Sequence, residues 1–366
     1  MPDTLAWHAG CWGCSTHPRM LRSPLPCAAV AAITVASANG GGQAEHGRLP
    51  ARERSAPPAG TTQPRLPTIV FLPDTQYYAS AFPDILAAQT SWIAHEQQRL
   101  GIAGVVQAGD LVDTWSSPPQ WKVVSSSMRI LDNRVPYLVV PGNHDTDSSR
   151  NGLLDSYFAP STMPWISGTM VPGKIDDNFA LLDIGPRQWL VLGLEFGPRD
   201  AALDWAGSVL RAHAELPAII VTHAYLYEDG TRYGSPHLGM GDHPRGGQRF
   251  APQEFDYTPT QGINDGEQIW RKLVVPNANV QLVLCGHDNG VARLTSRRPD
   301  GSRVQQILAD YQWLHQGADD YRGGSGFLRL LEFDYDKREL HVETYSPYLD
   351  QSLTDDGNRF TLVLDL

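Results

Sequence analysis

Five apolar runs in the sequence each end in a polar residue that can bind a metal ion. The runs read TIVFL, GVVQA, VPYLVV, PAIIVT and VQLVLC, and they begin at residues 68, 104, 135, 217 and 280. Each has the length of a buried strand, and helical spacing appears over 84–100, 120–133, 200–213 and 267–275. Strands and helices therefore alternate, which predicts βαβ units and a mainly parallel sheet.

The polar residues that follow these runs are candidate ligands: Asp74 and Gln76; Asp110; Asn143 and His144; His223; His287 and Asn289. A single such residue ordinarily caps a turn or a helix. Five strand ends in one α/β chain favour a common site instead, because sites form beyond the carboxyl ends of strands. Oxygen and nitrogen donors without a thiolate suit Mn, Fe, Zn, Mg or Ca.

The order and spacing of these residues resemble the motif set of the calcineurin-like metallophosphoesterases. The segments that carry the resemblance are DTQ at 74–76, GDLVD at 109–113, GNHD at 142–145, His223, and GHDN at 286–289. The usual family pattern is D-x-H, GDxxD, GNH(D/E), a lone His, and GHxH. The resemblance spans roughly 68–289. It implies a layered α/β fold in which two mixed β-sheets form a sandwich flanked by helices.

The resemblance also implies a dinuclear metal-dependent phosphoric ester hydrolase, in which a metal-bridging hydroxide attacks phosphorus in line. Asp110 matches the carboxylate that bridges the two ions, and Asn143, His223 and His287 match the other ligands of the second ion. His144 matches the histidine that assists the leaving group. Two further carboxylates match groups that orient the ligands or this imidazole: Asp113 and Asp145.

The departures from the family pattern both fall on the first metal. Asp74 matches one of its ligands, but Gln76 and Asn289 stand where the family usually has histidine. A site built only of oxygen ligands is expected to prefer a harder ion, such as Mg²⁺, Ca²⁺ or Mn²⁺, over Zn²⁺ or Fe. Asp288 is an alternative to Asn289 as ligand, although strand alternation disfavours it.

Three further side chains are candidates for substrate contacts: Tyr77, Arg245 and Tyr311. We expect a small phosphate ester as substrate, with a phosphodiester favoured over a phosphomonoester. The formal net charge of −11 argues against long nucleic acids, since clustered Lys and Arg hold phosphate backbones. The alternative function is a metal-binding pseudoenzyme or surface-interaction module with the same fold. Retention of His144, a residue of catalytic rather than packing value, argues against that alternative.

The first 67 residues differ from the rest of the chain. Residues 20–38 combine Arg22, a short apolar stretch and the A-x-A pattern Ala-Ser-Ala at 36–38, which predicts a signal peptide that starts at Met20. The alternative is a disordered Ala-rich tail. Residues 1–38 are thus a leader, 39–67 a flexible Pro/Gly-rich linker, and 68–366 the catalytic domain. We expect a secreted or periplasmic protein with no membrane span in the mature chain and Cys285 as a buried strand thiol.

Overall fold

The computed structural model describes residues 65–235, 248–255, 257, 262–314 and 322–366. The chain divides into two units, Met1–Gly60 and Thr61–Leu366, and all of these residues belong to the second. The predicted leader, nearly all of the predicted linker and Arg245 lie outside the described residues. Within the described part, no helix combines the length and the apolar character that a membrane span requires.

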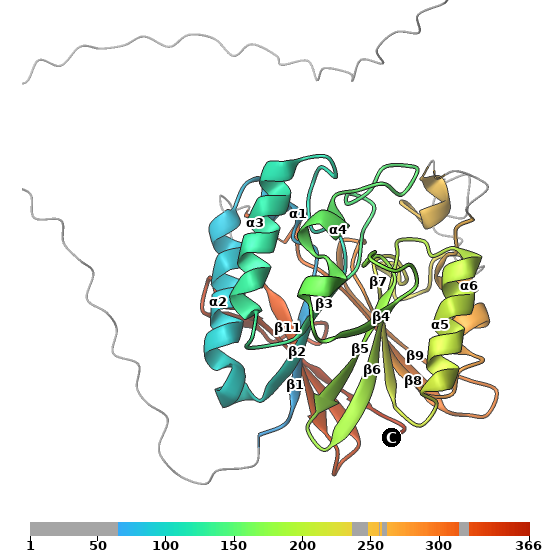
Figure 1. Cartoon of the computed structure of the whole chain (residues 1–366). Helices are drawn as coiled ribbons and strands as arrows, with labels where there is room; N and C mark the ends of the chain where they lie inside the picture. Colours follow the sequence, from blue (N-terminus) through green and yellow to red (C-terminus); the bar gives the residue numbers. More distant parts are fainter. Residues whose placement is uncertain (1–64, 236–247, 256, 258–261, 315–321) are drawn as a thin grey trace, which may run out of the picture. The chain divides into compact units, whose positions relative to one another are not determined.

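Two seven-stranded mixed sheets form the centre of the second unit (Figure 1). The first has the order β13-β12-β11-β1-β2-β3, and β14 pairs with β12. Its strands are β1 (Thr68–Leu72), β2 (Ile102–Gln107), β3 (Tyr137–Val139), β11 (Leu328–Asp334), β12 (Glu339–Ser346), β13 (Gln351–Leu353) and β14 (Phe360–Val363). The second has the order β4-β5-β6-β7-β8-β10-β9. Its strands are β4 (Ile166–Thr169), β5 (Asn178–Ile184), β6 (Arg187–Leu194), β7 (Ala218–Thr222), β8 (Val280–Cys285), β9 (Gly290–Arg297) and β10 (Arg303–Asp310).

The expectation of a mainly parallel sheet is wrong, whereas the two mixed sheets implied by the family resemblance are confirmed. Parallel pairs join β1 to β2 and β2 to β3 in the first sheet, and β6 to β7, β7 to β8 and β8 to β10 in the second. The remaining pairs are antiparallel because hairpins, which need no crossover helix, supply the outer strands. The hairpin predicted around 334–337 is confirmed as β11 and β12.

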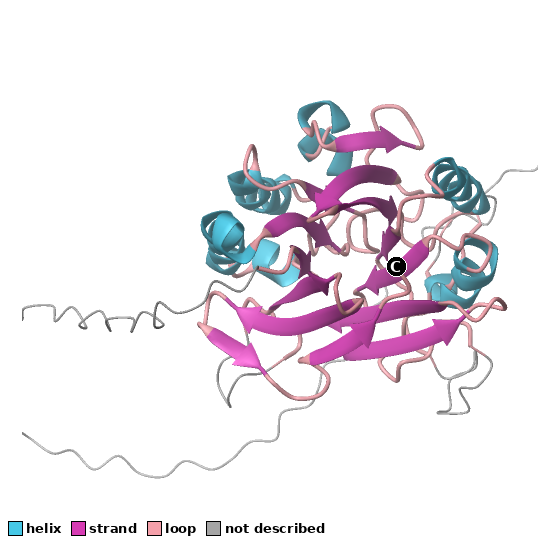
Figure 2. Ribbon diagram, turned by 90° about the horizontal axis from the view of Figure 1, so that it is seen from below, coloured by secondary structure: helices cyan, strands magenta, loops and turns pink. Residues whose placement is uncertain are grey.

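Helices cover the outer faces of both sheets (Figure 2). On the first sheet lie α2 (Pro83–Leu100) and α3 (Pro118–Met128), and on the second α5 (Asp200–Ala212) and α6 (Gly266–Ile269) with the π-helix Trp270–Val274. The shorter helices are α1 (Gln76–Ser80), α4 (Leu154–Tyr157), and the 3₁₀ turns Arg129–Leu131, Pro160–Thr162 and Pro252–Glu254. All four predicted helices are therefore present, the last as two short segments.

Strand β1 illustrates why the core strands read as continuous apolar runs. Ile69 and Phe71 pack between the two sheets with residues such as Ile219. Val70 and Leu72 point the other way and pack beneath α2 and α3. Because both faces of the strand are covered, every residue of β1 is buried and no polar position interrupts the run. The thiol of Cys285 at the end of β8 is likewise buried, as expected.

Candidate metal centre

The predicted ligands come together from both sheets rather than from one. Strands β1, β2 and β3 are parallel neighbours in the first sheet, and β7 and β8 are parallel neighbours in the second. A cavity of about 270 Å³ lies beyond their carboxyl ends. Its lining includes most of the residues that the motifs pointed to: Gln76, Asp110, Asn143, His144, His287 and Asn289.

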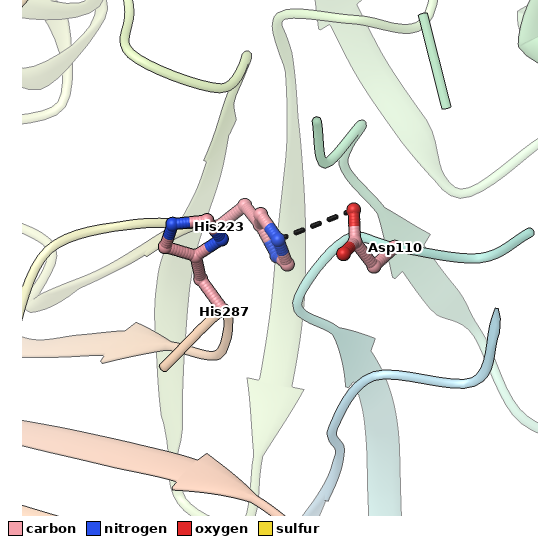
Figure 3. Close-up of side chains that lie close together, drawn as sticks. All are labelled: Asp110, His223 and His287. Atoms are coloured by element: carbon pink, nitrogen blue, oxygen red, sulfur yellow. Dashed lines mark ion pairs between the residues drawn. The ribbon is translucent and has the colours of Figure 1, made fainter. Parts of the chain in front are cut away.

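Asp110, His223 and His287 form a cluster in which one ligand atom of each lies within 4.8 Å of the others (Figure 3). Nε2 of His223 lies 3.2 Å from Oδ1 of Asp110 and 3.2 Å from Oδ1 of Asn143. On His287, Nε2 lies 2.7 Å from the backbone carbonyl of Phe250, so Nδ1 is the nitrogen left for a ligand. The four polar groups fit one divalent cation of mixed nitrogen and oxygen preference.

The electrostatics of this cluster depend on a proton shared by its members. Burial opposes ionisation of Asp110, but His223 lowers the pKa of Asp110 to about 2. Burial also opposes the His223 cation, yet Asp110 and Asp74 raise the pKa of His223 to about 10. Burial and the neighbouring His223 lower the pKa of His287 to about 3, so this imidazole is neutral. Since a ligating imidazole must be neutral, a divalent cation would displace the proton on His223.

The backbone at two ligand positions is strained. Asp110 has φ +50° and His287 has φ +76°, both in the left-handed region that non-glycine residues rarely adopt. Such conformations persist where the surrounding structure holds them, and they concentrate at functional sites. Two glycines add to this constraint, because a Cβ on Gly142 would collide with the Asp110 carboxylate, and one on Gly286 with the Asp74 carboxylate.

Asp145 holds the turn after β2 against the turn after β3. Its fully buried carboxylate accepts hydrogen bonds from the backbone N–H groups of Leu111, Val112 and Gly142, at 3.1, 3.0 and 2.7 Å. Burial and the nearby Asp110 raise the pKa of Asp145 to about 7. The geometry fits the orienting role expected from the sequence.

His144 lies on the cavity beside this cluster. Its Nδ1 lies 2.9 Å from the backbone carbonyl of Asp113, and its N–H donates to Oδ1 of Asp110. Burial disfavours the imidazolium, but the charge of Asp110 and the contact with Asp113 raise the pKa of His144 overall. Asp113 therefore orients the imidazole through its carbonyl rather than through its carboxylate, which the sequence did not indicate.

The other side of the cavity is built from amides and carboxylates. Gln76 opens helix α1, is 3% exposed, and donates from Nε2 to Oε1 of Gln312 at 2.7 Å. Its Oε1 is buried and has no hydrogen-bond partner among the described residues. The Asp74 carboxylate accepts the backbone N–H of His287 at 3.2 Å. A buried amide oxygen with no donor is costly, and a cation would satisfy it.

Asn289 and Asp288 differ in where they lie. Asn289 is exposed and lines the cavity. The Asp288 carboxylate is buried and accepts the backbone N–H groups of Glu228 and Asn289, and it is not among the residues that line the cavity. The geometry therefore favours Asn289 over Asp288 as the cavity-facing group.

The candidate substrate residues separate in the structure. Tyr77 lines the cavity and packs edge-on against Trp313, with 5.4 Å between ring centroids. Tyr311 is 3% exposed and bonds through its hydroxyl to side chains of the interior: Thr344, Asn358 and Arg329. A substrate contact by this hydroxyl is therefore not supported. Arg245 lies outside the described residues.

Two residues of this region were missing from the sequence-based set. Asp310 ends strand β10 and accepts two bonds from Gln312, one from its backbone N–H and one from Nε2, both at 2.9 Å. Burial and the interactions around it raise the pKa of Asp310 to about 7. The run QQILAD that precedes this position ends in a carboxylate, as the other strand ends do, and was a usable signal.

The two-sheet sandwich and the ligand cluster at its carboxyl edge define a metallophosphoesterase-type protein. Residues 67–290 match the family model described as calcineurin-like phosphoesterase, and the chain belongs to that family. Membership implies a metal-dependent phosphoric ester hydrolase and two divalent ions, and the cluster of Asp110, His223 and His287 fits one of them.

The chain is similar to individual proteins over most of its length. It is 34% identical over 318 residues to the uncharacterized protein YvnB of Bacillus subtilis (strain 168), which covers 82% of this chain and 22% of YvnB. The chain thus spans about a fifth of that relative. Purple acid phosphatase PPD1 from yellow lupin (Lupinus luteus) seeds matches at 17% identity and TM-score 0.47, over 82% of this chain and 54% of its own. TT1561 of Thermus thermophilus matches at 12% identity and TM-score 0.38, over 79% and 98%.

Proposed function

We propose that this protein is a phosphodiesterase that uses two divalent ions to hydrolyse a small phosphodiester. The observation that carries the proposal is the arrangement around one cavity of the Asp110, His223 and His287 cluster together with the imidazole of His144. A structural or packing role would not require three buried ligand atoms within 4.8 Å of one another beside a half-exposed imidazole.

The two ions would divide the ligands between them. Asp110, Asn143, His223 and His287 would hold one ion. The residues that would hold the other are Asp74, Gln76, Asp110 and Asn289. When bound, such ions supply a hydroxide at neutral pH and polarise the phosphoryl oxygens. The chain's own part is to hold these groups in place before substrate arrives, which is what the strained backbone and the Asp145 bonds do.

His144 would assist departure of the leaving group. With Nδ1–H donated to the Asp113 carbonyl, Nε2 is the ring nitrogen that can carry a transferable proton. The imidazole lines the same cavity as Asp110 and Asn143, within the space a phosphoryl group would occupy. Proton transfer from a positioned histidine to a departing alkoxide is general acid catalysis.

The lining of the cavity favours a diester over a monoester. Among the described lining residues there is no Lys or Arg, so a dianionic monoester would lack a side-chain cation for its third oxygen. Four aromatic rings stand at the cavity instead and offer an apolar surface to the second organic group of a diester: Tyr77, Phe250, Phe255 and Trp313. Export of the enzyme is part of the proposal and rests on the leader pattern of residues 20–38.

The proposal is tested with the full chain, stripped of metal and reconstituted with Mn²⁺, Zn²⁺, Mg²⁺, Ca²⁺ or Fe²⁺ singly and in pairs. We expect metal-restored hydrolysis of bis-p-nitrophenyl phosphate, with a higher kcat/KM than for p-nitrophenyl phosphate. A higher kcat/KM for the monoester would overturn the diester assignment. Metal binding without hydrolysis of either ester would favour the pseudoenzyme instead.

A further inference from the structure

We propose that Asp310 and Gln312 form a hydrogen-bond relay that turns the Oε1 atom of Gln76 toward the metal cavity and makes it a fixed oxygen ligand. The inference rests on the proposed two-metal function and deepens it. It assigns positioning roles to two residues outside the motifs, and it explains how the chain uses glutamine where its family usually has histidine.

The direction of each hydrogen bond follows from the chemistry of its partners. Both oxygens of the Asp310 carboxylate accept from Gln312, one from the backbone N–H and one from Nε2. With its Nε2 committed to Asp310, Gln312 presents Oε1 to its other neighbour. That oxygen accepts from Nε2 of Gln76 at 2.7 Å. The amide of Gln76 must therefore direct its own Oε1 away from Gln312.

Burial makes this orientation strict. Gln76, Asp310 and Gln312 are 3%, 1% and 6% exposed, so water cannot readily exchange for the partners in the relay. Turning the Gln76 amide by half a rotation would set two oxygens against each other at 2.7 Å. The one atom of the relay that lacks a partner among the described residues is Oε1 of Gln76, and Gln76 lines the cavity.

The topology explains why a residue so distant in sequence can serve this site. Strand β10 runs parallel to β8, and Leu308 is the register partner of Cys285. Asp310 therefore lies beside the turn that carries His287. On its other side β10 pairs with β9, where Asp310 is opposite Gly290. The relay thus joins the end of β10 to the segment after β1, across the two sheets.

The test uses the Asp310→Asn variant, which keeps size and removes one acceptor. The backbone N–H of Gln312 still requires the remaining oxygen, so the new amide presents its NH₂ group to the Gln312 side chain. That side chain must then turn and offer NH₂ to Gln76, whose Nε2 would face the cavity. Mn²⁺ binding to the full chain, measured calorimetrically without substrate, should show one of two Mn²⁺ equivalents weakened by about tenfold or more.

Loss of a negative charge would also weaken cation binding, so the decisive quantity is a coupling between two variants. Gln76→Glu supplies a carboxylate that can accept from the turned Gln312 amide and still present an oxygen to the ion. We expect it to restore Mn²⁺ affinity in the Asp310→Asn background. In the otherwise unchanged chain it should give no comparable gain, because its carboxylate then faces Oε1 of Gln312.

A matched control is Asp177→Asn, which alters another buried carboxylate that accepts a backbone N–H, from Glu195, and that does not line the metal cavity. It should leave both Mn²⁺ equivalents unchanged. An equal effect of Gln76→Glu in both backgrounds, or wild-type Mn²⁺ binding by Asp310→Asn, would overturn the relay. Because the readout is metal affinity, wild-type Mn²⁺ binding without ester hydrolysis would count against the proposed function alone.

Discussion

The two halves of the candidate metal centre are held in place by different means. The histidine half consists of Asp110, Asn143, His223 and His287, and the amide half consists of Asp74, Gln76 and Asn289. In the histidine half, the Asp145 carboxylate accepts three backbone N–H groups, and Nδ1 of His223 bonds the Ala108 carbonyl at 2.7 Å. In the amide half, the bonds that orient Gln76 run between side chains.

This difference shows how each half can change. Backbone bonds hold the turns of the histidine half whichever ligands those turns carry. The relay from Asp310 through Gln312 suits an amide at position 76, since it offers an acceptor to Nε2 and leaves Oε1 for an ion. A decayed site would have no use for such a buried, satisfied network. The glutamine therefore fits a retuned site that favours a harder ion.

The largest effect that we expect lies in the histidine half. His144→Ala removes the proposed proton donor but none of the proposed metal ligands. Turnover of bis-p-nitrophenyl phosphate should fall by about 10²–10⁴-fold. The melting temperature and Mn²⁺ affinity should stay close to those of the unchanged chain, because the half-exposed imidazole makes one side-chain hydrogen bond, to the Asp113 carbonyl. Unchanged turnover would remove His144 from the mechanism.

A smaller effect should come from the brace between the two turns. Asp145→Ala leaves three buried backbone N–H groups without their acceptor, which costs about 3 kcal/mol or more of unfolding free energy. Denaturant titration of the metal-free protein measures this loss. Gln120→Ala is the control on the same loop, where the N–H groups of Asp113 and Thr114 are less buried and water can replace Oε1 of Gln120. Equal losses in both variants would show that Asp145 is no special brace.

The sequence predicted the histidine half well because its residues follow strands within short, contiguous motifs. GDLVD and GNHD place ligand and turn together, so the strand ends alone bring Asp110, Asn143 and His144 close. The parallel pairs β1–β2–β3 and β7–β8 then follow from the alternation of strands and helices. The second sheet and its hairpins did not follow, since antiparallel partners leave no crossover helix to detect.

The amide half could not be completed from sequence. Gln312 lies more than two hundred residues from Gln76, and the contact depends on β10 pairing with β8. Two glutamines within β10, Gln305 and Gln306, interrupt its apolar run, so this sixth strand end did not stand out among the others. Tyr311 drew attention in its place, although its hydroxyl bonds to the protein interior.

The smallest effect distinguishes the two substituted positions themselves. Gln76 is buried within the relay, whereas Asn289 is exposed at the cavity. Asn289→His should therefore change unfolding free energy by no more than about 0.5 kcal/mol, as surface substitutions usually do. It should also raise the affinity for Zn²⁺ relative to Mn²⁺, because imidazole suits the softer ion. Competition titrations of the two metals measure the ratio. An unchanged ratio with intact folding would mean that Asn289 faces the cavity without binding the ion, so that Gln76 and Asp74 define the amide half.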